Sequence, residues 1–448
     1  MTTVLIATLT ACCVFAAGVY MRLFAQRKSA LGLSFVVIWS MHYILGNVLT
    51  LLSSTRTYTL LEFSEFELSY LLSVLAGLYF LLVYGQLLLR LPANHGARVA
   101  YLASARRTVV LFVAAGVVFS CMLVLQIGVS VYFSPELAFF RARLGDVAGE
   151  GIGVYYYLAS LLVPATMMAC AYAMDHPRKA NIAIAVLALA ASVVFFVPLG
   201  GRGRVMNMFF ILGLAYLIGK NEYRLHKLMT PRTLLFIAGV LFVSYVWGVL
   251  REDPLAEVST DSSAILRSLS VDLTRLNVQA FILDRYELLG SIGAGHFLES
   301  MLGPFMKFVP IGATDLIQSL SARWYHDTIG GVNVQSAISP SFVGETYLVF
   351  GIAGLLAAPY LLYAVVALMR RHLECDHPLS LAVIVYFYQF TIFHGGVYLM
   401  FDVFVITLPI LFLNRRLLAH PRSTQPGADS PKVVTVTPTA GLHDYGSA

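Results

Sequence analysis

The chain has 448 residues, of which 58% are hydrophobic and 12% are charged, with a mean hydropathy of +0.78 and a formal net charge of +6. A soluble protein carries about 25% charged residues. This composition excludes an ordinary water-soluble enzyme and predicts that most of the chain lies in a lipid bilayer.

Eleven apolar segments approach or exceed the roughly 20 residues that a helix needs to cross a membrane. They cover residues 3–21, 30–53, 68–89, 108–131, 153–174, 181–198, 205–219, 233–250, 342–368, 379–393 and 397–413. The last two belong to one apolar run, which His394-Gly395-Gly396 divides into a hairpin. We therefore expect an all-α fold, a polytopic membrane helix bundle with about 11 transmembrane helices.

Lysine and arginine are concentrated in alternate loops. These loops are residues 22–28, 90–107, 178–179, 220–232 and 370–371, together with the tail after residue 414. Because basic loops remain in the cytoplasm, we expect a periplasmic N-terminus and a cytoplasmic C-terminus.

This topology predicts four regions. They are 1–250 with transmembrane helices 1–8, a periplasmic loop over 251–341, 342–418 with helices 9–11, and a disordered cytoplasmic tail over 419–448, which is rich in Pro, Ser, Thr and Gly. Within the loop, residues 264–290 and 297–309 have apolar positions at helical spacing. These amphipathic helices are expected to fold back on the bundle as a lid over an outward-facing site.

The turn Gly200-Gly201-Arg202-Gly203-Arg204 lies between two apolar segments, on the predicted outer face. A guanidinium group offers a planar fork of donors that matches phosphate oxygens. Glycine lets the backbone approach a phosphate closely and donate its N–H groups. The turn therefore predicts a phosphate receptor, with Arg202 and Arg204 as catalytic residues and Gly201 and Gly203 as substrate-binding residues. The alternative is a turn whose arginines bind lipid headgroups.

A predicted span that follows the long loop opens with Gly344-Glu345-Thr346-Tyr347 and reaches Gly351. Together with the Gly-Arg-Gly turn and the outer loop, this run resembles the oligosaccharide repeat-unit polymerases, the O-antigen polymerase (Wzy) family. Members of that family carry an "sRG" turn and a "GExYxxfG" segment after a large periplasmic loop. The resemblance covers residues 195–360. A second arginine in the turn leaves open whether Arg202 or Arg204 corresponds to the family position.

The resemblance implies a membrane glycosyltransferase in the bacterial inner membrane. Such enzymes transfer a glycan from undecaprenyl pyrophosphate to a lipid-linked repeat unit at the periplasmic face, without a nucleotide sugar, a metal or another cofactor. The implied partners are undecaprenyl-pyrophosphate-linked oligosaccharides and the bilayer, with no nucleic acid; a chain-length regulator remains an open partner.

Glu345 and His326 are candidate catalytic groups for this reaction. Glu345 could deprotonate the acceptor hydroxyl or orient an arginine, and its alternative role is charge compensation in the first helical turn. His326 could act as the base, or it could cap a helix at the surface.

The remaining candidates are substrate-binding residues: Arg251, Arg275, Arg285, Tyr347, His394 and Asp402. The arginines could bind a second pyrophosphate or lie on a solvated helix face. Tyr347 could stack on a sugar or belong to the interfacial aromatic belt. Asp402 lies inside a predicted span and therefore needs a partner, such as His394 or an arginine.

Two other functions fit parts of this pattern. A periplasmic glycan ligase would share the arginines and the lid, and a flippase or transporter of lipid-linked oligosaccharides would handle the same substrate. A transporter should have basic residues along a path through the bundle, whereas the centres of these spans are almost free of Lys and Arg.

Overall fold

A computed structural model describes the chain over residues 2–25, 29–48, 57–58, 61–62, 67–91, 100–133, 152–196, 341–370 and 377–393, and at isolated positions or short groups between 230 and 302 and between 400 and 419. Over these residues the fold is all-helical, apart from four two-residue strands. The long helices are α1 (Thr2–Ala25), α2 (Ser29–Ser40), α4 (Glu67–Arg90), α5 (Ala105–Ile127), α9 (Ile152–Ser160), α10 (Leu162–Asp175), α11 (Lys179–Phe196), α19 (Ser341–Arg370) and α20 (Pro378–Tyr388).

Shorter elements complete this framework. The turn α6 (Val129–Tyr132) follows α5, and the π-helical segments η1 (Met41–Leu45) and η5 (Gln389–Phe393) continue α2 and α20. The antiparallel strand pairs are β1 (Thr57–Tyr58) with β2 (Leu61–Glu62) and β3 (Ala100–Tyr101) with β4 (Leu418–Ala419).

Six helices in the described part of the chain are long and apolar enough to cross a membrane. They are Ile6–Leu23, Leu68–Arg90, Ala105–Ile127, Val154–Asp175, Lys179–Phe196 and Ser341–Met369, with Gly32–Val48 as a shorter apolar helix. All seven coincide with predicted spans. The predicted span 205–219 lies outside the described residues, and 233–250 is described only at four helical positions.

The surfaces of these helices are apolar where they face outward. The side chains of Leu111, Leu125 and Leu187 are 67%, 72% and 68% exposed. Aliphatic surface of this extent is costly in water but not in hydrocarbon. The helices therefore suit a lipid surrounding, which makes the chain a helical membrane protein.

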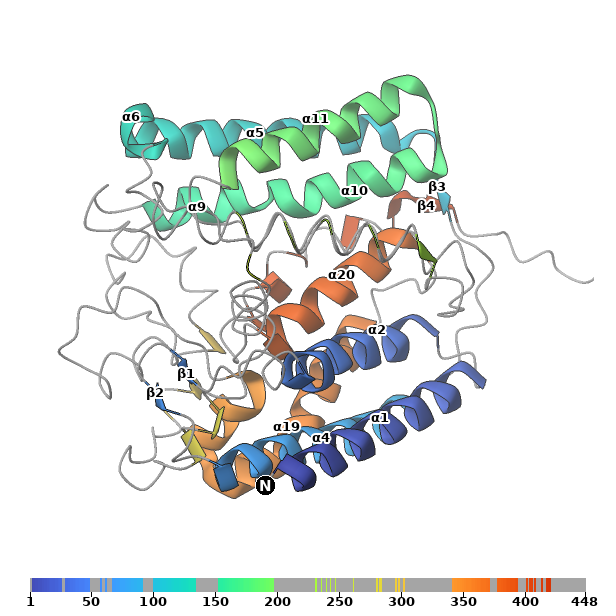
Figure 1. The fold of residues 1–448 in the computed structure, drawn as a ribbon. Helices are drawn as coiled ribbons and strands as arrows, with labels where there is room; N and C mark the ends of the chain where they lie inside the picture. Colours follow the sequence, from blue (N-terminus) through green and yellow to red (C-terminus); the bar gives the residue numbers. More distant parts are fainter. Residues whose placement is uncertain are drawn as a thin grey trace, which may run out of the picture.

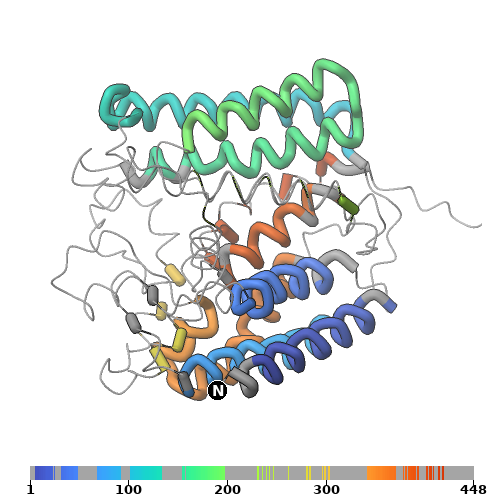
Figure 2. The backbone as a smooth tube through the Cα atoms, viewed as in Figure 1, coloured from blue at the N-terminus to red at the C-terminus, as the bar shows by residue number. Residues whose placement is uncertain are grey.

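The helices form two groups that meet at α20 (Figures 1 and 2). One group contains α5, α9, α10 and α11, and the other contains α1, α2, α4 and α19. In the first group, a Cβ atom at Gly116 would lie 2.8 Å from the Cα of Leu162, so glycine permits the close approach of α5 and α10. A hydrogen bond of 2.9 Å between the hydroxyls of Thr166 and Ser192 joins α10 to α11.

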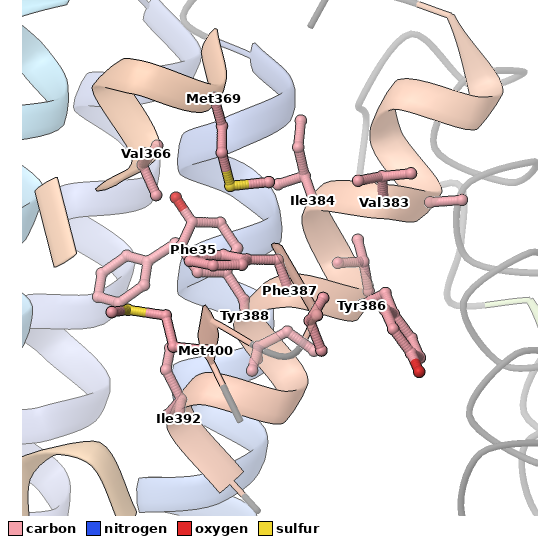
Figure 3. Packing of buried hydrophobic residues seen from close by; sticks show 14 of the residues in the cluster. Phe35, Val366, Met369, Val383, Ile384, Tyr386, Phe387, Tyr388, Ile392 and Met400 are labelled. Atoms are coloured by element: carbon pink, nitrogen blue, oxygen red, sulfur yellow. The ribbon is translucent and has the colours of Figure 1, made fainter. Parts of the chain in front are cut away.

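Large aromatic side chains fill the core of the second group, where α20 packs against α2. Phe35 and Tyr388 approach with their ring centroids 5.7 Å apart, among the side chains that Figure 3 shows. The hydroxyls of Tyr84 and Tyr388 share a hydrogen bond of 2.8 Å. One phenol donates to the other, which offsets part of the cost of burying these two polar atoms in the aromatic core.

One end of the molecule is closed by a clasp, which we define as β3, β4, Asp175 and His377. Asp175 Oδ2 accepts hydrogen bonds of 2.9 Å from the Tyr101 amide and from His377 Nε2. Nδ1 of His377 accepts from the amide of Leu379 and caps α20, so the proton of this imidazole lies on Nε2. Burial, and secondarily the Asp175 carboxylate, raise the pKa of the Tyr101 phenol well above its usual range.

The clasp brings together four chain segments that the charge pattern assigns to one side of the membrane. They are the ends of α10 and α20, the strand before α5 and the segment after the last predicted span. Helix ends that lie on one side of a bilayer must lie at a similar depth along the membrane normal. This arrangement therefore agrees with the alternation of basic loops along the sequence.

Candidate functional site

Glu345 lies in the second turn of α19, and its side chain is only 1% exposed. Proline at position 340 precedes the helix, as predicted for a helix start. The Ser341 hydroxyl accepts a hydrogen bond of 3.3 Å from the Gly344 amide and so caps the first turn. A carboxylate buried near the start of a membrane helix is costly, and such a group is a functional candidate by default.

A kink at Gly351 separates the turns that carry Glu345 from the rest of α19. Gly351 has φ 60° and ψ −143°, a backbone conformation available essentially to glycine alone. Three residues later, a Cβ atom at Gly354 would lie 1.9 Å from the Thr346 carbonyl oxygen. Both glycines are therefore required by geometry, and the first of them is the glycine that ends the "GExYxxfG" segment.

A segment of the predicted outer loop packs against the first residue of α19, one turn before Glu345. Gln279 is helical and 1% exposed, and its Oε1 accepts hydrogen bonds from the hydroxyls of Ser341, at 3.2 Å, and Tyr43, at 3.5 Å. Its neighbours Ala280 and Ile282 are fully buried. Gln279 thus contacts both α19 and η1.

A second part of the loop packs nine residues further along α19, at Phe350. The ring centroids of Phe297 and Phe350 are 5.1 Å apart in an edge-to-face arrangement, and Met301 packs on the same core. Leu298 and Leu302, on the opposite face, are 57% and 55% exposed. Phe297 and Met301 hold this segment to the bundle, and its outward positions 298 and 302 are leucines too, so the described residues do not show the predicted amphipathic character.

The partner helix at this site is distorted. Tyr43 lies in η1, a π-helical turn, and stacks on Trp39 with ring centroids 5.1 Å apart. A Cβ atom at Gly77 of α4 would lie 2.1 Å from the Tyr43 ring, so the glycine makes room for the phenol. His42 is fully buried in the same turn. Single-turn π-helices are frequent at functional sites.

Two of the predicted site residues lie in the described part of the chain. Glu345 is buried and Tyr347 is half-buried. Side chains two residues apart on a helix do not share a face, so the fold does not bring these two together through α19. The other predicted residues lie outside the described residues: Arg202, Arg204, Gly201, Gly203, Arg251, Arg275, Arg285, His326, His394 and Asp402.

Sequence reasoning missed three residues of this polar cluster, namely Tyr43, Gln279 and Ser341. Gln279 is a polar residue in a segment with charged residues on both sides. The spacing of apolar residues in that segment therefore does not predict that Gln279 is buried. Tyr43 was weakly indicated. It lies in one apolar segment and Gly77 in another, and a glycine in a membrane helix often marks a place where another helix packs closely. Among the described residues, no group of three or more His, Cys, Asp or Glu side chains is arranged to hold a metal ion.

Comparisons of the chain with protein-family models, with curated proteins and with solved structures found no match. What the fold defines is the class, a helical membrane protein with a buried carboxylate, Glu345, in a helix that Gln279 and Phe297 contact.

Proposed function

We propose that the protein polymerises lipid-linked oligosaccharide repeat units. The observation that carries this proposal is the buried Glu345, in the second turn of α19 and one turn after Ser341, which donates to Gln279. It belongs to the segment that resembles O-antigen polymerases. The proposal includes eleven spans, an outer-facing loop over 251–341, a periplasmic N-terminus and a cytoplasmic C-terminus, in the inner membrane of a bacterium.

The reaction moves a glycan from one lipid carrier to another. An acceptor hydroxyl attacks the anomeric carbon of the growing glycan, and the bond from this carbon to a pyrophosphate oxygen breaks. The hydroxyl proton passes to a base, for which Glu345 is the proposed group, and undecaprenyl pyrophosphate leaves. A base needs hydrogen-bond reach of the proton and a pKa suited to the reaction.

Arg202 and Arg204 are proposed to stabilise the leaving pyrophosphate. Negative charge grows on its oxygens as the glycosidic bond breaks, and fixed donors in a poorly hydrated site stabilise such charge. One donor of this kind can contribute roughly 3–4 kcal/mol to the barrier reduction. The proposed role of Arg251, Arg275 and Arg285 is to bind the pyrophosphate of the second substrate.

The test uses purified protein and lipid-linked repeat units, with the products separated on a gel. Wild-type protein should build a ladder of polymers and release undecaprenyl pyrophosphate, whether or not a chelator is present. Arg202→Ala and Arg204→Ala, inserted at normal levels, should leave single repeats, and Arg202→Lys and Arg204→Lys serve as charge-retaining controls. Full-length polymer from both alanine variants would rule out the arginine assignment.

A second assay separates the polymerase from its alternatives. Cells without a polymerase accumulate single lipid-linked repeats, whereas cells without a ligase accumulate long lipid-linked polymer, and cells without a flippase retain repeats on the cytoplasmic leaflet. Cysteine labelling at residues 200–204 from the periplasm tests the proposed sidedness independently of activity.

A further inference from the structure

We infer that Gln279 is a positioning residue, which holds the first turn of α19 and so places Glu345 for the reaction. This inference rests on the proposed function for its chemistry but on the contacts of Gln279 for its geometry. Gln279 comes from the loop, Ser341 from the start of α19 and Tyr43 from η1. A single amide oxygen therefore joins three segments that are far apart in the sequence.

The hydrogen bonds of this oxygen use its full capacity. An amide oxygen has two lone pairs, and here one accepts from Ser341 and the other accepts from Tyr43. All three side chains are 1% exposed. Since water does not reach them, removing the amide oxygen would leave two buried hydroxyls without this acceptor, which costs more than losing an exposed hydrogen bond.

Ser341 transmits the position of Gln279 to Glu345. Its hydroxyl donates to Gln279 and accepts from the Gly344 amide, so the contact to the loop also fixes the helix cap. Ser341 has φ 67°, a conformation that a residue with a side chain adopts only when its surroundings hold it. Residues 341 and 345 are one turn apart and share a face of the helix. A shift of Ser341 therefore displaces the carboxylate.

Gln279 also has an unused group. Its Nε2 has no hydrogen-bond partner among the residues that the structure describes, although the side chain is buried. Buried amide groups of this kind are rare in proteins and require an explanation. An apolar side chain of the same size would avoid burying Nε2, but it would leave the hydroxyls of Ser341 and Tyr43 without their shared acceptor. The acceptor oxygen therefore explains why a glutamine occupies this buried position.

The experiment compares Gln279→Met, which keeps the size but removes the acceptor, with Gln279→Glu, which keeps an acceptor oxygen. In a background without native cysteines, Val343→Cys, at a position 4% exposed, reports on the first turn of α19 through its labelling by a membrane-impermeant maleimide. Leu298→Cys is the exposed control. Labelling of Val343→Cys should rise roughly tenfold with Gln279→Met and stay within about twofold with Gln279→Glu.

Activity gives the second readout. With Gln279→Met, kcat for polymerisation should fall roughly tenfold while KM stays within about twofold, and Gln279→Glu should restore kcat. Tyr43→Phe removes one donor and should raise labelling roughly threefold, yet add nothing to Gln279→Met because the two act through one bond. If Gln279→Met does not reach the membrane, Tyr43→Phe alone provides the measurement.

The outcomes separate the two proposals. Unchanged labelling in Gln279→Met and in Tyr43→Phe, or additive effects of the two substitutions, would overturn the positioning role even if the protein polymerises. Altered labelling in a protein that never polymerises would overturn the proposed function and keep the structural link. A Leu298→Cys control that is labelled only from the cytoplasm would overturn the proposed topology.

Discussion

Replacing Gly354 by alanine should destabilise the turn of α19 that follows Glu345. The new Cβ atom would lie 1.9 Å from the Thr346 carbonyl oxygen and 2.6 Å from its carbon. These are backbone atoms, so no side-chain rotation relieves the clash, and the turn that follows Glu345 must move. Overpacking of this kind costs about 1–3 kcal/mol and occasionally more.

Gly351→Ala tests the same kink by another mechanism. The cost arises because φ 60° with ψ −143° is strained for alanine, at about 1–3 kcal/mol. Gly18→Ala is the matched control, because nothing lies within 4 Å of the added Cβ atom in the middle of α1. Alanine there should stabilise the helix by about 1 kcal/mol.

Unfolding in mixed micelles with increasing SDS measures these differences. We expect the midpoint to fall for Gly354→Ala and Gly351→Ala and to rise slightly for Gly18→Ala. Polymerisation should be lost in the first two variants, because the kink sets the position of the turns that carry Glu345, and it should persist in the third. Wild-type stability and activity in Gly354→Ala would show that the close approach to Thr346 does not hold α19.

Two further predictions concern the packing between segments. His377→Asn keeps a good helix cap but loses the hydrogen bond to Asp175, so it should destabilise the protein by about 1.5–3 kcal/mol. Asp175→Asn keeps an acceptor oxygen and should destabilise the protein less. Equal losses of stability in the two variants would contradict the role assigned to this hydrogen bond. Gly77→Ala should cost about 1–3 kcal/mol, since its Cβ atom would lie 2.1 Å from the Tyr43 ring. Gly77→Ala should be partly rescued by Tyr43→Leu, and the absence of any rescue in the unfolding midpoint would refute the proposed clash.

The sequence was sufficient to locate the apolar helices of the described residues, because hydrocarbon favours uninterrupted apolar segments whatever their neighbours are. The segment 68–89 matches α4 closely at both ends, whereas 108–131 is displaced by three and four residues from the ends of α5, since α5 ends before Gly128. The start of α19 after Pro340 was likewise predictable, since proline restricts the backbone before it and lacks an amide donor. These features depend only on local chemistry.

The distortions within helices could not be predicted in this way. Residues 41–45 read as part of a regular apolar helix, yet they form a π-helical turn that places Tyr43 against Gly77. The kink at Gly351 is similar, because glycine occurs in regular membrane helices as well as in broken ones. In both cases the deciding contact comes from another helix, and apolar periodicity contains no information about it.

Of the polar cluster formed by Glu345, Gln279, Ser341 and Tyr43, only Glu345 was predicted. It stands in the segment Gly344-Glu345-Thr346-Tyr347, and an acid in a predicted membrane span is itself conspicuous. Gln279, Ser341 and Tyr43 are uncharged, and their importance depends on a contact between a loop and two helices. Pairing of this kind over long sequence separations requires the folded chain.

The strand pair β3 and β4 has a consequence for the order of assembly. It joins residues 100 and 101 to residues 418 and 419, so it cannot form until nearly the whole chain has left the ribosome. Until then α5, α10 and α11 are attached to the other helices only through contacts made earlier in synthesis. Pairing of β3 with β4 is therefore a late event of biogenesis. A nascent chain released before residue 418 lacks this pairing and should be recognised by the quality-control proteases of the membrane.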